Sequence, residues 1–260
     1  MTLFIAFTAA AFGLVFGSFL NVCIYRLPRE KSIVWPASFC PNCSTPIKPY
    51  DNIPIIGFLL LGGKCRACKA PISWRYPVIE GIAGALTVLY TLRHYEHLAW
   101  LPVVLAAVYA LLVLAVIDID FMIIPDELSL GLLGLGLAAS WLNPAFSGSG
   151  WRHLLSSAVG AGVGFFLVWG MAVAGEWVFK KEAMGGGDVK LMAGIGALLG
   201  WQGAICTLLL GSLFGSVYGI ALMISKRAGR SQPIPFGPFL ALGAAINLYI
   251  PIPLTAFLIG

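Results

Sequence analysis

The stretch LPVVLAAVYALLVLAVID, Leu101–Asp118, has no charged residue before its last position. About 20 apolar residues are enough for a helix to cross the hydrocarbon core of a bilayer. A carboxylate beside hydrocarbon is costly, so an acid at this place is a functional candidate. The stretch predicts a membrane-spanning helix that carries Asp118 at one edge of the membrane.

The composition of the whole chain is that of an integral membrane protein. Its 260 residues are 59% hydrophobic and only 10% charged, whereas soluble domains are about 45–50% apolar and about 25% charged. The 31 glycines suit helices in lipid, where small residues let backbones approach. The net charge of +5 does not indicate a nucleic-acid partner, because the basic residues gather in a few loops.

Apolar segments along the chain predict an all-α integral membrane protein with about eight transmembrane helices. They cover approximately residues 3–23, 77–92, 100–117, 127–142, 154–179, 189–200, 203–224 and 238–259. The first has no basic residue before it and is followed by Arg26 and Arg29. A cleavable signal peptide shows the reverse charge order, so we expect a retained helix whose N-terminus is outside.

The distribution of basic residues predicts the orientation. Fourteen of the 16 lysines and arginines fall in loops 24–76, 180–190 and 225–237, against Arg93 and Arg152 in the other loops. Since cytoplasmic loops carry the excess of Lys and Arg, these three loops are expected inside the cell. The third and fifth spans then both run inward, which places Asp118 and Asp188 at the same, cytoplasmic depth. We predict three regions: a first helix at 1–23, a cytoplasmic insertion at 24–76 and a seven-helix membrane domain at 77–260.

The insertion 24–76 contains two C-x-x-C pairs and little apolar sequence. Four thiolates with zinc-ribbon-like spacing complete a tetrahedral shell, so we expect a structural Zn²⁺ held by Cys40, Cys43, Cys65 and Cys68. Such a metal would fold a loop that has almost no core of its own. Redox-active cysteine pairs are the alternative, although a reducing cytoplasm disfavours disulfides.

The acidic residues have different expected roles. Asp188 follows three glycines, Gly185 to Gly187, and is either a helix N-cap or a functional acid beside bare backbone that an extended peptide could approach. We expect Asp126 to be a helix cap and Asp120 a solvated loop acid. Glu80 is either in an ion pair with Arg75 or in contact with the substrate. Lys190 is expected to reach the interface or to stabilise the Asp188 carboxylate.

These motifs together resemble the type IV prepilin peptidase family over nearly the whole chain. The resemblance is carried, in order, by the segment Gly17–Pro28, the cysteine pairs, Arg75–Glu80, the I-D…P-D segment, the G-x-G-D segment and Pro233–Pro238. It implies an aspartic peptidase of the bacterial inner membrane whose catalytic pair is Asp118 and Asp188. We expect Glu80, Gly185, Gly187 and Lys190 to position the substrate.

The resemblance also implies the reaction and its partners. Members remove the short basic leader of type IV prepilins and pseudopilins after a glycine, at the cytoplasmic face. Many then methylate the new N-terminus with S-adenosylmethionine, for which this sequence shows no independent motif. One departure is Gly186, where the family's variable residue is often larger.

Other classes fit the sequence less well. No phosphate-binding loop and no Ser–His arrangement is recognisable. A presenilin-like protease shares G-x-G-D, but its partner motif is Tyr-Asp, and this chain has Ile117-Asp118. A proton-coupled transporter would carry its acids nearer the middle of the bilayer.

Overall fold

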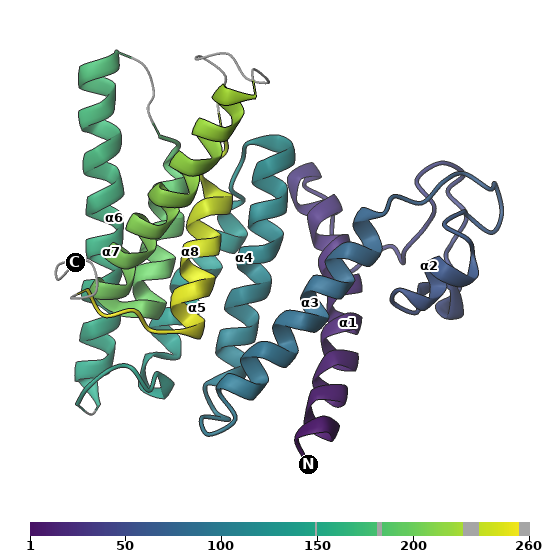
Figure 1. The fold of residues 1–260 in the computed structure, drawn as a ribbon, viewed down its shortest axis with the longest axis horizontal. Helices are drawn as coiled ribbons and strands as arrows, with labels where there is room; N and C mark the ends of the chain where they lie inside the picture. The colour runs from purple at the N-terminus through teal and green to yellow at the C-terminus, as the bar shows by residue number, and fades with distance from the viewer. Residues whose placement is uncertain (149, 181–183, 226–233, 255–260) are drawn as a thin grey trace. The chain divides into compact units, whose positions relative to one another are not determined.

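The computed structural model is all-helical and describes residues 1–148, 150–180, 184–225 and 234–254 (Figure 1). Its helices are α1 (Thr2–Arg26), α2 (Ile56–Leu60), α3 (Arg75–Arg93), α4 (Leu101–Phe121), α5 (Asp126–Ala138), α6 (Trp151–Phe179), α7 (Gly186–Ile224) and α8 (Gly237–Tyr249). Each of the eight predicted apolar segments contains helix, and two of them lie in α7. The last, 238–259, is helical only to Tyr249, and its residues 255–259 lie outside the described part of the chain. In the described residues, α1, α4, α6 and α7 are long and apolar enough to cross a membrane.

The chain divides into two compact units, Met1–Glu96 and His97–Gly260. In the first unit, α1 and α3 pack side by side, and the cysteine segment with α2 connects them. Gly13 and Gly17 allow this packing: a Cβ at Gly17 would lie 2.6 Å from the Cα of Glu80. Glycines four residues apart form such close helix contacts in membranes, where lipid provides no hydrophobic drive.

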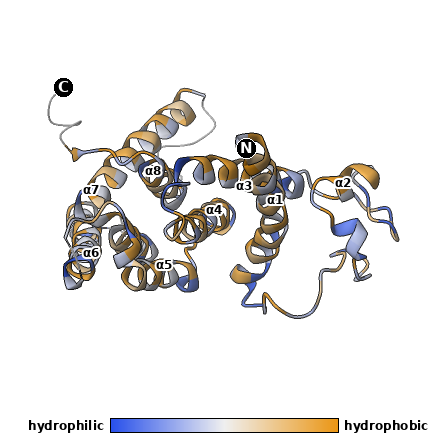
Figure 2. Cartoon of the chain, turned by 90° about the horizontal axis from the view of Figure 1, so that it is seen from below, coloured by the Kyte–Doolittle hydropathy of each residue, from blue (hydrophilic) through white to orange (hydrophobic). Residues whose placement is uncertain are grey.

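The second unit is a bundle of α4 to α8 in which α7 is central. The helices α5, α6 and α8 all pack against α7, and α4 packs against α8. Small residues again permit the contacts: a Cβ at Gly160 would collide with the carbonyl oxygen of Gly196. Figure 2 shows that apolar residues predominate along the helices and that hydrophilic residues gather in the connecting segments.

The helix α7 is interrupted at Gly200, whose φ of 74° and ψ of 178° are not helical. A break of this kind frees backbone carbonyls that need hydrogen-bond donors when they are buried. Asn143 Nδ2 donates to the Leu198 oxygen at 2.7 Å, and Ser157 Oγ donates to the Ala197 oxygen at 2.7 Å. Ser157 of α6 and Asn143, in the connection between α5 and α6, therefore stabilise the break, which separates the predicted segments 189–200 and 203–224.

Candidate active site and metal centre

The first candidate acid, Asp118, lies near the end of α4 and is buried, with 6% of its surface exposed. Its Oδ2 accepts a hydrogen bond of 2.9 Å from the backbone N–H of Gly237, the first residue of α8. The helix continues to Phe121, so the expectation that Asp120 lies in a loop was wrong. Because residues two apart point to different faces of a helix, Asp120 is exposed while Asp118 is buried.

The second candidate acid, Asp188, lies in the first turn of α7 and is 8% exposed. The expected alternative role as N-cap is wrong, because the helix begins at Gly186 and Gly185 is the N-cap. No side-chain hydrogen bond caps this helix. Among the described residues, the buried Oδ1 of Asp188 has no hydrogen-bond partner. A buried, unpaired carboxylate oxygen is costly and is typical of a reactive site.

The structure brings the two acids together. The carboxylates of Asp118 and Asp188 are close enough for their charges to interact. Ile124 lies against the glycine next to each of them: a Cβ at Gly187 would be 2.8 Å from Ile124 Cβ, and one at Gly237 would be 3.3 Å from Ile124 Cδ1. The end of α4 and the starts of α7 and α8 therefore meet at one place.

The residues around the pair differ partly from the expectations. Lys190 does not pair with Asp188. Its Nζ forms an ion pair with Asp126 at 2.7 Å. Asp126 is the first residue of α5 and makes no side-chain cap hydrogen bond, so its expected role as a cap was also wrong. This exposed pair links the first turns of α5 and α7.

Sequence reasoning missed Gly237 and Ile124. A Cβ at Gly237 would lie 2.7 Å from Asp118 Oδ2, so only glycine leaves space for the carboxylate there. Gly237 lies in the segment Pro233–Pro238 that carries the family resemblance, but the sequence alone indicated no role for it. The expected positioning roles of Gly185, Gly187 and Lys190 stay predictions, and packing against Ile124 gives Gly187 a second reason to lack a side chain.

The four predicted metal ligands form one cluster. The Sγ atoms of Cys40, Cys43, Cys65 and Cys68 all lie within 4.8 Å of one another. Two cross-pairs, Cys40–Cys68 and Cys43–Cys65, are separated by 3.9 and 4.0 Å. A tetrahedral zinc with Zn–S bonds of about 2.3 Å requires sulfurs about 3.8 Å apart, whereas a disulfide requires about 2.05 Å. The donor set therefore fits a Zn²⁺ ion and contains no disulfide.

The two cysteine pairs lie in two backbone turns of the same type. In the first turn, the Cys40 N–H donates to the Thr45 carbonyl oxygen and the Ser44 N–H donates to the Cys40 carbonyl oxygen. In the second turn, the Cys65 N–H donates to the Ala70 carbonyl oxygen and the Lys69 N–H donates to the Cys65 carbonyl oxygen. Backbone N–H groups of Cys68 and Ala67 lower the pKa of the Cys65 thiol. The amide of Asn42, which donates to Cys68 Sγ at 3.6 Å, lowers the pKa of the Cys68 thiol. Both effects favour the thiolate form that binds metal.

Glu80 belongs to the first unit and is 7% exposed. Its Oε2 accepts a 2.7 Å hydrogen bond from the backbone N–H of Ile55, which has a positive φ of 60°. Within the described part of the chain Glu80 forms no ion pair, so the alternative of a pair with Arg75 is not what the structure shows. Its expected contact with the substrate stays a prediction.

Comparisons with known proteins agree with this arrangement. A family model described as the bacterial peptidase A24 N-terminal domain matches residues 11–94, and one described as the type IV leader peptidase family matches residues 105–220. The chain is 38% identical to a prepilin leader peptidase/N-methyltransferase of Aeromonas hydrophila, covering 91% of this chain and 88% of the relative.

The chain belongs to the type IV leader peptidase family.

Relatives with the same description in Pseudomonas aeruginosa and Legionella pneumophila are 37% and 34% identical. They match 91% and 95% of this chain, and 87% and 91% of their own lengths. No solved structure matches the chain. The two family models fall in the two structural units, so the cysteine cluster belongs to the first and the paired acids to the second. Like its family, the chain is a multi-pass membrane protein.

Proposed function

We propose that this chain is a membrane aspartic endopeptidase that removes the basic leader of type IV prepilins and pseudopilins. We propose that it then methylates the new N-terminus. One observation carries the peptidase assignment: two buried carboxylates, distant in sequence, meet at the end of α4 and the start of α7. A carboxyl pair that shares one proton can act as base and acid in the same reaction.

The pair supplies both proton transfers of peptide hydrolysis. One ionised aspartate accepts a proton from water while the water oxygen attacks the scissile carbonyl carbon. The other, protonated, donates a hydrogen bond to the carbonyl oxygen and then helps protonate the leaving amine. Gly237 N–H makes Oδ2 of Asp118 an acceptor. Any proton on Asp118 is therefore carried by Oδ1, and Gly237 orients the carboxyl for its task.

The proposed setting is the bacterial cytoplasmic (inner) membrane, with about eight spans, the N-terminus outside and the paired acids at the cytoplasmic face. The lopsided distribution of basic residues supports this orientation. Of the loop residues that carry it, Lys181, Lys226, Arg227 and Arg230 lie outside the described part of the chain. A reporter fused after Arg93 or Arg152 should behave as external and one after Lys69 as cytoplasmic. A periplasmic reporter signal from the 180–190 loop would contradict the model.

We propose that a Zn²⁺ ion, bound by the four cysteines, folds the segment between α1 and α3. Zinc would supply structural cross-linking there, because four thiolates leave no open position for a reacting water. The cysteines would then hold the two turns together, and they would take no part in the reaction of the two aspartates.

Purified protein and a prepilin, incubated with and without S-adenosylmethionine and analysed by mass spectrometry, test the proposal. We expect loss of the leader mass in both reactions and one added methyl group only with the methyl donor. An unprocessed prepilin in both reactions, with correctly folded protein, would exclude the peptidase.

A further inference from the structure

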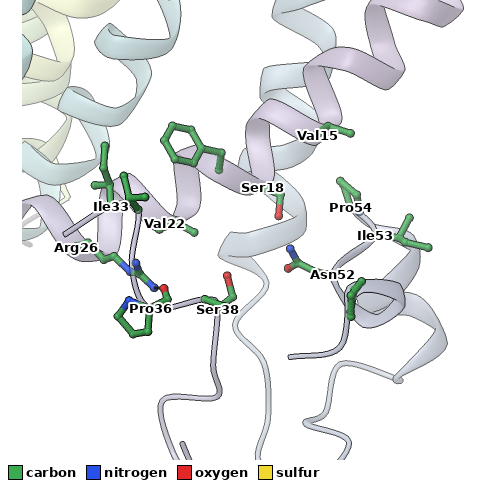
Figure 3. A pocket seen from close by; sticks show the side chains of 14 residues that line it. Val15, Ser18, Val22, Arg26, Ile33, Pro36, Ser38, Asn52, Ile53 and Pro54 are labelled. Atoms are coloured by element: carbon green, nitrogen blue, oxygen red, sulfur yellow. Dashed lines mark hydrogen bonds between the residues drawn. The ribbon is translucent and has the colours of Figure 1, made fainter. Parts of the chain in front are cut away.

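The backbone just before Asp188 is not free to pair with a peptide as a strand. Helix α7 begins at Gly186, so Gly186 and Gly187 are helical, whereas a strand requires an extended chain. A cavity of about 460 Å³ lies in the first unit, with Val22 and Arg26 of α1 in its wall (Figure 3). That wall contains no residue of the second unit. The cavity therefore does not explain how a peptide is held at the two acids.

An extended segment connects the end of α4 to the start of α5, close to Asp118 in the chain. Met122 ends α4 in the left-handed conformation, with a φ of 54°, and its N–H donates to the Asp118 carbonyl oxygen at 2.9 Å. Ile123, Ile124 and Pro125 then follow without helix or turn, and Pro125 has the extended angles φ −59° and ψ 133°. Among the described residues, the backbone N–H and C=O groups of Ile123 and Ile124 have no hydrogen-bond partner. The segment is therefore a short extended edge whose backbone is unpaired.

The two isoleucines of this segment have different surroundings. Ile124 is half-buried, and its side chain lies against Gly187 and Gly237. Ile123 is 45% exposed. Neighbouring side chains of an extended chain point to opposite faces, which agrees with this difference. The side chain of Ile124 thus fixes the segment beside the paired acids, while Ile123 keeps it at the surface of the unit.

A peptide that is cut at the two acids has to be extended. In a helix, each carbonyl oxygen accepts from the N–H four residues later, and the surrounding side chains shield the backbone from an attacking water. Unwinding the helix breaks these hydrogen bonds and leaves donors and acceptors without partners, which is costly at the edge of a membrane. An unpaired strand edge supplies the missing partners. The segment between α4 and α5 has the groups that an unwound peptide needs.

We propose that Ile123 and Ile124 form a docking strand, which binds the segment of the prepilin around the scissile bond by backbone hydrogen bonds. The inference rests on the proposed function and names the contact by which the same site holds its substrate. It agrees with the position of the segment, since Ile123 is five residues after Asp118 and Ile124 contacts the glycine before Asp188. Backbone groups are the same in every peptide, so a docking strand accepts prepilins and pseudopilins whose side chains differ.

Synthetic prepilin peptides, each with one N-methylated backbone amide, test the docking strand. In a strand, only every second residue directs its N–H and C=O groups to a given neighbour. Binding is measured to the full-length Asp188→Asn variant, which should hold the peptide without cutting it. Methylation of alternate residues on either side of the scissile bond should raise the Kd by about tenfold, and methylation of the residues between them by less than about threefold. A methyl group at the far end of the leader is the matched control and should leave the Kd unchanged.

Photo-crosslinking shows where on the protein the peptide binds. A benzoylphenylalanine in place of Ile123, in the Asp188→Asn variant, should label the prepilin residues next to the scissile bond. The same group in place of Leu130, which is 49% exposed in α5, should not label them. Equal effects of methylation at neighbouring residues, no effect at any residue, or no labelling from position 123 would overturn the inference. Cleavage of the unmodified peptide by the wild-type protein shows separately whether the proposed peptidase is correct.

Discussion

The two units of the chain are stabilised in different ways. Of residues 27–78, all of which the structure describes, only Cys40 and Gly57 are buried. In α7 of the second unit, sixteen residues between Asp188 and Gly211 are buried. A segment with so little buried surface cannot offset the entropy of ordering its backbone. The segment between α1 and α3 therefore needs a cross-link between its turns, while the second unit is held by close helix packing.

The largest effect expected in the second unit is loss of the paired acids. Asp118→Asn or Asp188→Asn should each reduce prepilin cleavage by about 10⁴-fold or more, because the amide can neither ionise nor hold the acid proton. The double mutant should be no worse than either single mutant, since the two act as one unit. Mass spectrometry of the prepilin after timed incubation measures this.

The matched control for this experiment is Asp120→Asn, an exposed acid two residues from Asp118. It should cleave within about twofold of wild type, as expected for an exposed residue away from the site. Zinc content should be unchanged in every aspartate mutant. Normal processing by either catalytic mutant would refute the assignment of the two aspartates. Loss of zinc from an aspartate mutant would contradict the proposal that the zinc site and the paired acids belong to independent units.

Replacing a cysteine tests whether a metal cross-link stabilises the first unit. Replacement of Cys40, Cys43, Cys65 or Cys68 by serine should lower the bound zinc from about one ion per chain to near zero. The segment 30–75 should then become sensitive to limited proteolysis, while fragments from residues 97–260 stay intact. Elemental analysis and peptide mapping measure both outcomes.

Cys206→Ser serves as the control, because Cys206 is buried in α7 of the second unit. It should leave the zinc content unchanged. Fully active and protease-resistant protein without any metal would eliminate the zinc proposal, and activity that follows thiol oxidation would favour redox pairs instead.

A smaller effect is expected when only the placement of Asp118 changes. In Gly237→Ala, the new Cβ would lie 2.7 Å from Asp118 Oδ2, too close for a real contact, so the carboxylate must shift. A displacement of about 1 Å at a catalytic group can cost about 10²-fold in rate. Gly131→Ala, at a position with nothing within 4 Å, should change kcat by less than about twofold. Equal rates for the two variants would show that Gly237 does not position Asp118.

The smallest effect is expected at the exposed pair of Lys190 and Asp126. Surface ion pairs contribute about 0–1 kcal/mol, so Asp126→Asn or Lys190→Met should lower kcat/KM only a few-fold. The double mutant should match the single mutants if the pair acts by linking α5 to α7. If the losses of kcat/KM in the two single mutants add up in the double mutant, Lys190 contacts the substrate independently of Asp126, as the sequence alone suggested.

Local sequence patterns predicted the helices, the cysteine cluster and the meeting of the two acids. Apolar runs indicate spans, and the basic loops predict which span ends share one depth, which placed Asp118 and Asp188 at the same depth. Their assignment as a catalytic pair came from the family resemblance. The contacts of Gly237 and Ile124 could not be predicted, because Gly237 is 119 residues from Asp118 in sequence. The ion pair of Lys190 could not be predicted for the same reason. Asp188 is close to Lys190 in sequence, but the partner of Lys190 is Asp126, which lies on another helix.

The short helices around the paired acids have a consequence for the surrounding lipid. Helices α5 and α8 have 13 residues each, and α7 is interrupted at Gly200. At about 1.5 Å per residue, 13 residues extend only about 20 Å, against a hydrocarbon core of about 30 Å. A bilayer beside such helices is expected to thin in order to match them. The thickness of the membrane, and not only the side chains, would then set how far water must travel to reach the two carboxylates.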